Sequence, residues 1–294
     1  MKISVILSNY NGARYLEDAI RSVLEQGYDD YEFIIVDDGS EDDSPDIIRR
    51  FADSYPEKII AVLEPENRGQ AAGFNLAVAR ASGDIVAFID SDDLWMPGKL
   101  ANLAAFIALA GPAALYQHNL LFMEGDTKTD MPYHTLMVTG NLYEETCATR
   151  KLPTVFVPTS GLAFPRSILE KVMPVPEAFR TCADGYLTRT VYYHGTVASI
   201  NTAWGYYRVH EFNSVYNNPA HNQGRYRNKT LVPMLNRYYA SIGAELRLPV
   251  FDVWHIKDAV WIMAHYSLYE IFSSLYKWYK RTFSEKNIKV MAKK

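Results

Sequence analysis

The chain has 294 residues, of which 48% are hydrophobic and 22% are charged, and this composition is ordinary for a soluble globular protein. The formal net charge of −4 argues against a general nucleic-acid-binding protein, because binding to the phosphate backbone requires an excess of Lys and Arg. Two cysteines, Cys147 and Cys182, are too few for a disulfide framework, so we expect free thiols in a reducing, cytoplasmic compartment.

The N-terminal part of the chain alternates short apolar runs with helical patterns. These patterns predict strands over residues 3–7, 33–36, 59–63 and 85–89, and helices over residues 13–25, from about residue 44, and over residues 70–80. Strands that are apolar on both faces and alternate with helices are typical of a mostly parallel, Rossmann-like α/β sheet that is flanked by helices.

Polar residues follow each of these predicted strands. They occupy residues 8–11, 37–38, 64–68 and 90–93. Because parallel strands end at one edge of their sheet, we expect these four segments to converge on a single crevice. Independent surface loops would have no reason to place polar residues at the same end of every strand.

The second half of the chain is less regular. We predict helices over residues 97–110, 167–172 and 184–193, strands over 113–123 and 197–207, and helical structure from about residue 223. Prolines interrupt any period in residues 125–160. Residues 101–123 carry no charge and are long enough to span a bilayer. Gly111 and Pro112 break this run, so we expect a buried helix, a turn and a core strand there.

The predicted strand at residues 85–89 ends in three carboxylates, Asp90, Asp92 and Asp93. Neighbouring carboxylates repel one another, and burying them requires a cation. A solvated acidic turn is one interpretation, since such turns are common. Their place at the carboxyl end of a strand instead favours a site for a divalent metal that carries phosphates.

Four motifs occur in order along the first hundred residues. They are Ser-Val-Ile-Leu-Ser-Asn-Tyr-Asn at residues 4–11, Ile-Val-Asp-Asp-Gly-Ser at 35–40, Asn-Arg-Gly at 67–69 and Ile-Asp-Ser-Asp-Asp at 89–93. Together they resemble the family-2 glycosyltransferases of the GT-A fold. The resemblance continues at residues 183–186 and 207–210. We therefore predict a GT-A domain over residues 1–215 and a helical, aromatic-rich C-terminal extension over residues 216–294.

The resemblance implies a metal-dependent, hexosyltransferase-like enzyme. It would move a sugar, with inversion, from a nucleotide-diphosphate donor to a hydroxyl acceptor in polysaccharide or glycolipid synthesis. The ring of Tyr10 would stack on the base, and Asp38 would accept a hydrogen bond from an imino group, which favours a UDP-sugar. A core position for Tyr10 and a solvated Arg68 stay open as alternatives. The residues implied in donor binding are Ser8, Tyr10, Asp38, Arg68, Asp90 and Arg208.

The resemblance also implies metal ligands, a general base and acceptor contacts. Asp92 and His210 would bind Mn²⁺ or Mg²⁺, although a purely structural His210 stays open. Asp184 would take the proton of the acceptor hydroxyl. Many relatives carry Glu-Asp where this chain has Ala-Asp, and Asp184 as a helix cap is the alternative. The acceptor is expected near Trp95, Ser160 and Gly161, and a core position for Trp95 stays open.

The C-terminal extension combines an aromatic segment, residues 253–279, with a basic end. Aromatic residues followed by cations suit an interface with anionic lipid. Such an interface would hold the enzyme at the inner face of the membrane, near a glycan or lipid-linked acceptor. A homodimer helix, or a helix packed on the catalytic domain with a solvated tail, also fits this pattern.

Two other functions compete with this interpretation. A nucleotidyltransferase also places carboxylates at the ends of parallel strands, but it usually opens with a Gly-rich, basic loop, and residues 8–12, Ser-Asn-Tyr-Asn-Gly, contain no basic residue. A non-catalytic nucleotide- or glycan-binding relative would be expected to have lost Asp92 or Asp184, and this chain keeps both.

Overall fold

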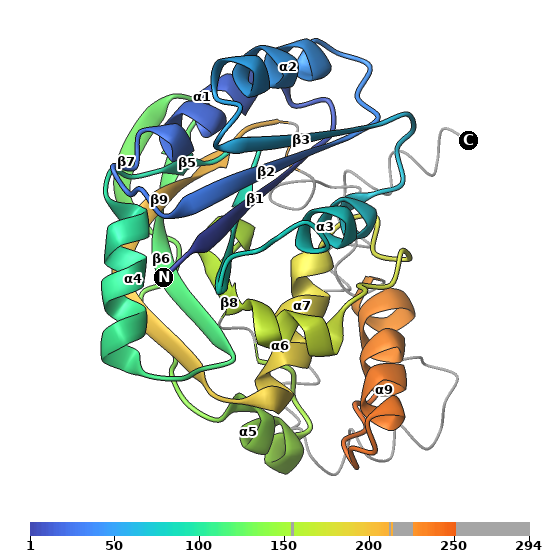
Figure 1. The fold of residues 1–294 in the computed structure, drawn as a ribbon. Helices are drawn as coiled ribbons and strands as arrows, with labels where there is room; N and C mark the ends of the chain where they lie inside the picture. The colour runs from blue at the N-terminus through green and yellow to red at the C-terminus, as the bar shows by residue number, and fades with distance from the viewer. Residues whose placement is uncertain (154–155, 212, 214–225, 251–294) are drawn as a thin grey trace, which may run out of the picture. The chain divides into compact units, whose positions relative to one another are not determined.

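The computed structural model describes residues 1–153, 156–211, 213 and 226–250 (Figure 1). The chain divides into two compact units, residues 1–247 and 248–294, and nearly all of the second unit lies outside the described residues. The first unit continues past residue 215, the predicted end of the catalytic domain. A separate extension over residues 216–294 stays a prediction, and its aromatic segment and basic end lie outside the described residues.

Four parallel strands form one half of the sheet, as predicted. They are β1 (Ile3–Asn9), β2 (Tyr31–Asp38), β3 (Ile59–Glu64) and β4 (Ile85–Asp90), in the spatial order β3-β2-β1-β4. Asn9 of β1 pairs with Asp37 of β2, and Ser8 of β1 pairs with Asp90 of β4. The polar residues at the carboxyl ends of these strands therefore lie at one edge of the sheet.

The other half of the sheet is mixed. It continues from β4 through β8 (Leu162–Pro165), β6 (Leu115–Glu124), β9 (Val197–Val209) and β5 (Leu94–Trp95), and β7 (Thr127–Pro132) pairs with β6. β8 is antiparallel to β4 and β6, whereas β6 and β9 are parallel. The sequence predicted β6 and β9. It missed the other three because β5 and β8 are too short to show a period and β7 is largely polar.

Helices cover both faces of the parallel half, because successive residues of a strand point to opposite faces. Val5 of β1 shares a buried cluster with Leu16 of α1, and residues of α2 and α4 belong to the same cluster. On the opposite face lies α3 (Figure 1). Phe74 of α3 packs on Phe88 of β4, with ring centroids 4.8 Å apart. These four helices are α1 (Ala13–Leu24), α2 (Ser44–Ser54), α3 (Gln70–Val78) and α4 (Lys99–Ala110).

Shorter helices follow in the second half of the chain. They are α5 (Leu142–Thr149), α6 (Arg166–Val172), α7 (Ala183–Val191), α9 (Val232–Ser241) and the 3₁₀ turns Thr159–Gly161 and Tyr192–His194. The sequence predicted α6 and α7, whereas α5 lies in the part that showed no period. The hydroxyl of Tyr239 in α9 lies 3.1 Å from that of Tyr192, so α9 packs onto the end of α7.

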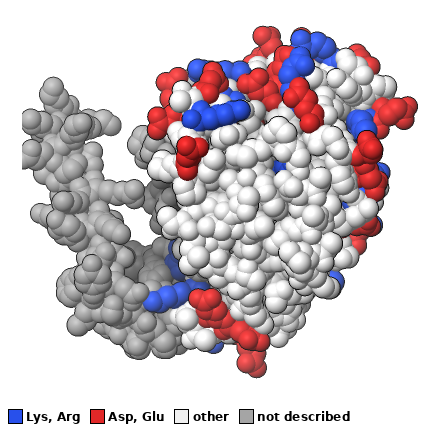
Figure 2. Space-filling model, turned by 90° about the vertical axis from the view of Figure 1, so that its left-hand side faces the viewer, with Lys and Arg blue, Asp and Glu red and all other residues white. Residues whose placement is uncertain are grey.

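The uncharged segment 101–123 forms most of α4, a turn and β6, as the sequence predicts. α4 lies on the side of the molecule seen in Figure 2, whose middle is largely uncharged and whose charged side chains gather above and along the edges. Among the described residues, no helix is both long enough and apolar enough to cross a bilayer.

Candidate active site at the carboxyl ends of the parallel strands

An open cleft lies beside the carboxyl ends of β1, β2 and β3. Its volume is about 520 Å³, which is within the usual range for small-molecule sites. Tyr10, directly after β1, lines this cleft and is 47% exposed, so a planar ligand has access to its ring. The other lining residues come from the ends of β2 and β3, from the loops that follow these strands and from α2, and they include Asp37, Ser40, Arg49 and Glu64.

Asp37 and Asp38, the last residues of β2, are both buried and both hold loops. Asp37 accepts hydrogen bonds from Ser40 N (2.9 Å) and Ser40 Oγ (2.7 Å). Asp38 accepts hydrogen bonds from the backbone N–H groups of Arg68 (2.9 Å) and Gly69 (2.6 Å), one on each oxygen. The sequence predicts base recognition by Asp38. Such a contact would have to use a lone pair that these two hydrogen bonds leave over.

Gly39 allows the loops after β2 and β3 to touch. Its φ is +69°, and a Cβ added there would lie 2.5 Å from the carbonyl carbon of Glu66 and 2.7 Å from Asn67 N. A side chain at this position would push the two loops apart. Residues 66 and 67 line the cleft. The absence of a side chain at Gly39 therefore allows the two loops to meet and close the wall of the cleft.

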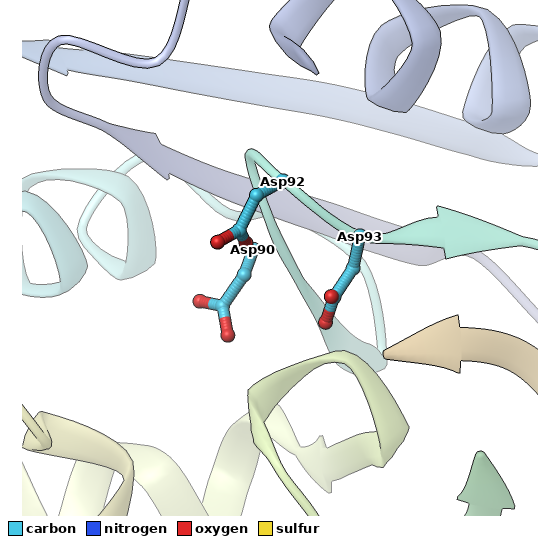
Figure 3. A group of neighbouring side chains, drawn as sticks. All are labelled: Asp90, Asp92 and Asp93. Carbon is cyan, nitrogen blue, oxygen red and sulfur yellow. The ribbon is translucent and has the colours of Figure 1, made fainter. Parts of the chain in front are cut away.

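Three carboxylates meet at the end of β4 (Figure 3). Asp90 is the last residue of the strand, and Asp92 and Asp93 follow in the turn before β5. One oxygen from each carboxylate lies within 4.8 Å of the others. Asp93 is fully buried, whereas Asp90 and Asp92 are partly exposed. Asp90 and Asp92 are therefore open to a ligand, and Asp93 lies behind them.

The chemistry of this cluster fits a divalent cation. Burial raises the pKa of Asp90 and Asp93, and repulsion from the neighbouring carboxylates raises it further. A bound cation would relieve this repulsion. His210 Nε2 lies 2.9 Å from Asp92 Oδ2, so the structure brings together the two predicted ligands. Carboxylate oxygens beside an imidazole nitrogen form a donor set that suits an ion such as Mn²⁺.

Arg208 is fully buried beneath the carboxylates. Its backbone N–H donates to Asp93 Oδ1 (2.9 Å), and its guanidinium donates to the backbone oxygens of Asp92 (2.8 Å) and Gly125 (2.9 Å). It also forms an ion pair with Asp126. The sequence predicts that Arg208 contacts the donor. The structure differs, because the guanidinium is used inside the protein, where it holds the turn that carries Asp92 and Asp93.

Ser160 and Trp95, expected at the acceptor, are also buried behind the carboxylates. Ser160 Oγ donates to Asp93 Oδ2 (2.5 Å) and accepts a hydrogen bond from Asp90 N (2.9 Å). The carbonyl oxygen of Ser160 accepts hydrogen bonds from the indole N–H of Trp95 (3.2 Å) and from Lys99 Nζ (2.7 Å). Ser160 therefore contacts the aspartates and Trp95 contacts Ser160 and Lys99, so neither side chain faces the solvent, from which an acceptor would bind.

Lys99 is a part of this support that the sequence analysis missed. It is 1% exposed, and its ammonium lies 3.5 Å from the ring centroid of Trp95. Burial lowers the pKa of Lys99 well below its usual value, against the opposing effect of Asp93. The available sequence signal was a single lysine at the start of an otherwise uncharged helix. From the sequence alone, a lysine at the start of a helix is expected to be exposed to solvent, and only the packing shows that this one is buried.

The remaining predicted residues differ in their access to a ligand. Arg68 is at the surface, with 41% of its side chain exposed, and pairs with Glu177 at 2.5 Å. Ser8 is half-buried beside Asp90 in the sheet. Gly161 is buried, and a Cβ there would lie 2.7 Å from the carbonyl oxygen of His118. Ser8 and Arg68 are therefore accessible, whereas Gly161 serves close packing.

Asp184 lies in the first turn of α7 and is half-buried. Burial raises its pKa, and the Arg189 guanidinium opposes this effect. The charge of Asp184 in turn contributes to the raised pKa of Asp90, so the two carboxylates lie close enough to interact. The predicted base therefore lies within electrostatic range of the carboxylate cluster, and its role stays a prediction.

The chain belongs to glycosyl transferase family 2, whose family model matches residues 4–173. It is 40% identical over 219 residues to an uncharacterized glycosyltransferase of Nostoc sp., and this match covers 73% of the chain and 66% of the relative. It is 38% identical over 132 residues to a putative teichuronic acid biosynthesis glycosyltransferase of Bacillus subtilis, covering 45% of the chain and 52% of that protein. The chain thus spans about half to two thirds of the length of these relatives.

Solved glycosyltransferases share the fold. A TarS fragment of S. aureus in complex with UDP-GlcNAc superposes with a TM-score of 0.65 at 20% identity, covering 84% of this chain and 68% of that one. A mannosyltransferase of Pyrobaculum calidifontis in complex with GDP-Man and Mn²⁺ superposes with a TM-score of 0.56 at 21% identity, covering 99% of this chain and 83% of that one. These likenesses confirm the predicted GT-A fold.

Replacing Ser160 by Ala tests the support behind the carboxylates. The change leaves Asp93 Oδ2 and the N–H of Asp90 without this partner, so we expect a loss of about 1–3 kcal/mol in the free energy of unfolding, measured by urea denaturation. Ser54→Ala is the matched control, because the Ser54 hydroxyl lies on the exposed side of α2 and its loss should cost less than about 0.5 kcal/mol. Equal stability of the two variants would contradict the assignment.

Proposed function

We propose that the protein is an inverting glycosyltransferase that transfers a sugar from a nucleotide-diphosphate donor to a hydroxyl group. One observation carries the proposal: the cleft with Tyr10 and the open carboxylates Asp90 and Asp92 lie at the carboxyl ends of neighbouring parallel strands, and the charge of Asp184 reaches Asp90. A nucleobase, a diphosphate and an acceptor need three such neighbouring places. Membership of glycosyl transferase family 2 favours sugar transfer over the nucleotidyl transfer that the carboxylates alone would allow.

The donor nucleotide would occupy the cleft. Its base would stack on the exposed ring of Tyr10, and the accessible side chains of Ser8 and Arg68 would contact the rest of the nucleotide. Structures with the same fold bind UDP-GlcNAc or GDP-Man, which supports a nucleotide-sugar donor for this chain. An imino contact with Asp38 would lean towards a UDP-sugar, while guanine and thymine also present imino donors.

A divalent cation, Mn²⁺ or Mg²⁺, would be held by Asp92 and His210, with Asp90 beside them. When bound, it neutralises the negative charge that develops on the departing diphosphate. Asp93 and Arg208 fix the turn that carries Asp92, so the site needs little rearrangement when the ion binds. The Mn²⁺ complex of the structurally similar mannosyltransferase supports this assignment.

Asp184 would act as the general base. In an inverting transfer, a carboxylate removes the proton of the acceptor hydroxyl on the side of the sugar opposite the diphosphate. Burial of Asp184 raises its pKa, which makes it a stronger base than a solvated aspartate. The influence of its charge on Asp90 supports a place for this base near the carboxylate cluster, where the sugar would be held.

The acceptor would be a glycan or a lipid-linked sugar in polysaccharide or glycolipid synthesis. The name of the Bacillus subtilis relative, which refers to teichuronic acid biosynthesis, supports this class. A lipid-linked acceptor would place a cytoplasmic enzyme at the inner face of the membrane. Peripheral membrane contact or a homodimer through residues 216–294 remains part of this proposal, although most of these residues lie outside the described structure.

Replacing Asp92 by Ala tests the metal site. We expect UDP with Mn²⁺ to raise the melting temperature of the full chain, by the equivalent of about 2.7 kcal/mol at a ligand concentration one hundred times Kd, and UDP or Mn²⁺ alone to do much less. GDP and dTDP serve as competing nucleotides. Asp92→Ala should lose the metal-dependent part of the shift, whereas the exposed control Asp53→Ala should keep it. A variant Asp92→Ala that responds like wild type would refute the metal ligand.

Replacing Asp184 by Asn tests the base. The variant keeps the size of the side chain but loses the proton acceptor, so UDP release from UDP-GlcNAc or UDP-glucose should fall about 10²–10⁴-fold. Binding of UDP with Mn²⁺ should stay unchanged. In wild type, release should also decline as the pH falls through the raised pKa of Asp184, because the base becomes protonated. Unchanged turnover in Asp184→Asn would show that this residue is not the base.

A further inference from the structure

The segment that leads into α3 is joined to the segment that leads into α7. We call this contact the α3–α7 junction; it consists of residues 67–71 and 179–183, and α3 and α7 lie side by side (Figure 1). Gln70 N donates to the carbonyl oxygen of Arg180 (3.0 Å), and Ala71 N donates to that of Phe179 (3.1 Å). Two segments that are far apart in the sequence are thus bonded backbone to backbone.

Gly69 allows the two backbones to approach this closely. Its φ is +96°, and a Cβ added there would lie 2.6 Å from Arg180 Cα. The Arg180 guanidinium reaches back across the contact and donates to the carbonyl oxygen of Asn67 (3.1 Å). The junction therefore leaves little room for the two segments to move relative to each other.

The side chain of Gln70 completes the junction at the start of α7. Cys182, the residue before the helix, makes no side-chain cap hydrogen bond. The first N–H groups of a helix need partners from outside the helix. Gln70 Oε1 accepts a hydrogen bond from Ala183 N at 2.8 Å. A side chain of α3 therefore caps α7, and the next residue of α7 is Asp184.

The other side of the same segment is held at the cleft. Asp38 accepts hydrogen bonds from the N–H groups of Arg68 and Gly69, immediately before Gln70. A continuous series of hydrogen bonds thus runs from the end of β2, through residues 68–70, to the first turn of α7. Its two ends are the strand that borders the nucleotide cleft and the helix that carries the candidate base.

We propose that Gln70 is a positioning residue for the transfer reaction, because its amide oxygen fixes the first turn of α7 and thereby places the Asp184 carboxylate relative to the bound donor. The inference rests on the proposed role of Asp184 as base. Gln70 would not touch the reacting atoms. Displacing a reacting group by about 1 Å can cost roughly a hundredfold in rate, so the loss of one well-placed hydrogen bond can reduce turnover without weakening donor binding.

A second contact along α3 provides a matched control. Asn75 Nδ2 donates to the carbonyl oxygen of Val175 (2.9 Å), and Asn75 Oδ1 accepts from Val175 N (2.8 Å). Like Gln70, Asn75 joins α3 to the segment before α7 through a side-chain amide. Unlike those of Gln70, these side-chain hydrogen bonds go to Val175, before the first turn of α7. Asn75→Ala therefore removes a similar contact without releasing Ala183.

The test compares Gln70→Met, which keeps the length of the side chain but has no acceptor oxygen, with Gln70→Glu, which keeps the oxygen. In the full chain, Gln70→Met should bind UDP with Mn²⁺ within about twofold of wild type by thermal shift. Its UDP release from UDP-GlcNAc or UDP-glucose should fall roughly ten- to hundredfold. Gln70→Glu should recover most of this loss. Asn75→Ala should lower the melting temperature without a comparable fall in turnover.

Hydrogen exchange separates the positioning role from general destabilisation. Amides of residues 183–187 should exchange faster in Gln70→Met than in wild type, whereas amides of α1 should not. In an Asp184→Asn background, Gln70→Met should cause little further loss of turnover, because both changes act through one carboxylate.

Two results would overturn the inference and leave the proposed function intact: wild-type turnover in Gln70→Met while Asp184→Asn is inactive, or Gln70→Glu as impaired as Gln70→Met. Wild-type turnover in Asp184→Asn would instead overturn the proposed base, and the exchange of residues 183–187 would still report whether Gln70 holds α7.

Discussion

Repulsion among the carboxylates at the end of β4 is the constraint around which the rest of the site is arranged. Like charges within 4.8 Å of one another are costly in a partly buried place. Hydrogen bonds on the inner side of the cluster offset part of this repulsion, because Asp93 accepts hydrogen bonds from Ser160 and from the backbone of Arg208. The protein leaves Asp90 and Asp92 open in front. The site is thus held by hydrogen bonds on its inner side and leaves two carboxylates on its outer side, and carboxylates are ligands that Mg²⁺ uses together with substrate phosphates.

The parallel half of the fold could be predicted because it depends on local patterns. Continuous apolar runs mark strands that are covered on both faces, and the polar residues that end them mark the edge where ligands bind. The mixed half was harder. β5 consists of Leu94 and Trp95 alone, too few residues for any period, and it exists because β9 lies beside it. β7 is polar because it pairs only with β6.

The sequence indicates residues whose chemical type and motif identify them. It does not indicate residues whose role depends on whether their side chain is buried. Asp92 and His210 are hydrogen-bonded neighbours, and the charge of Asp184 reaches Asp90; their roles as metal ligands and base stay predictions. Ser160 and Arg208 lie behind the carboxylates, since a sequence does not reveal on which side of an acidic turn a polar side chain will lie. Contacts between distant segments were beyond sequence patterns altogether, such as the hydrogen bond from Ala183 to Gln70.

The most direct test of the central claim is the uptake of Mn²⁺ by the full chain, followed by electron paramagnetic resonance of the free ion while UDP is added. We predict that one equivalent of Mn²⁺ leaves the free pool when UDP is present, and that much less does so without nucleotide, because Asp92 and His210 would hold the ion together with diphosphate oxygens. If Mn²⁺ stays free in the presence of UDP, GDP and dTDP alike, the carboxylates at the end of β4 do not form a metal–nucleotide site.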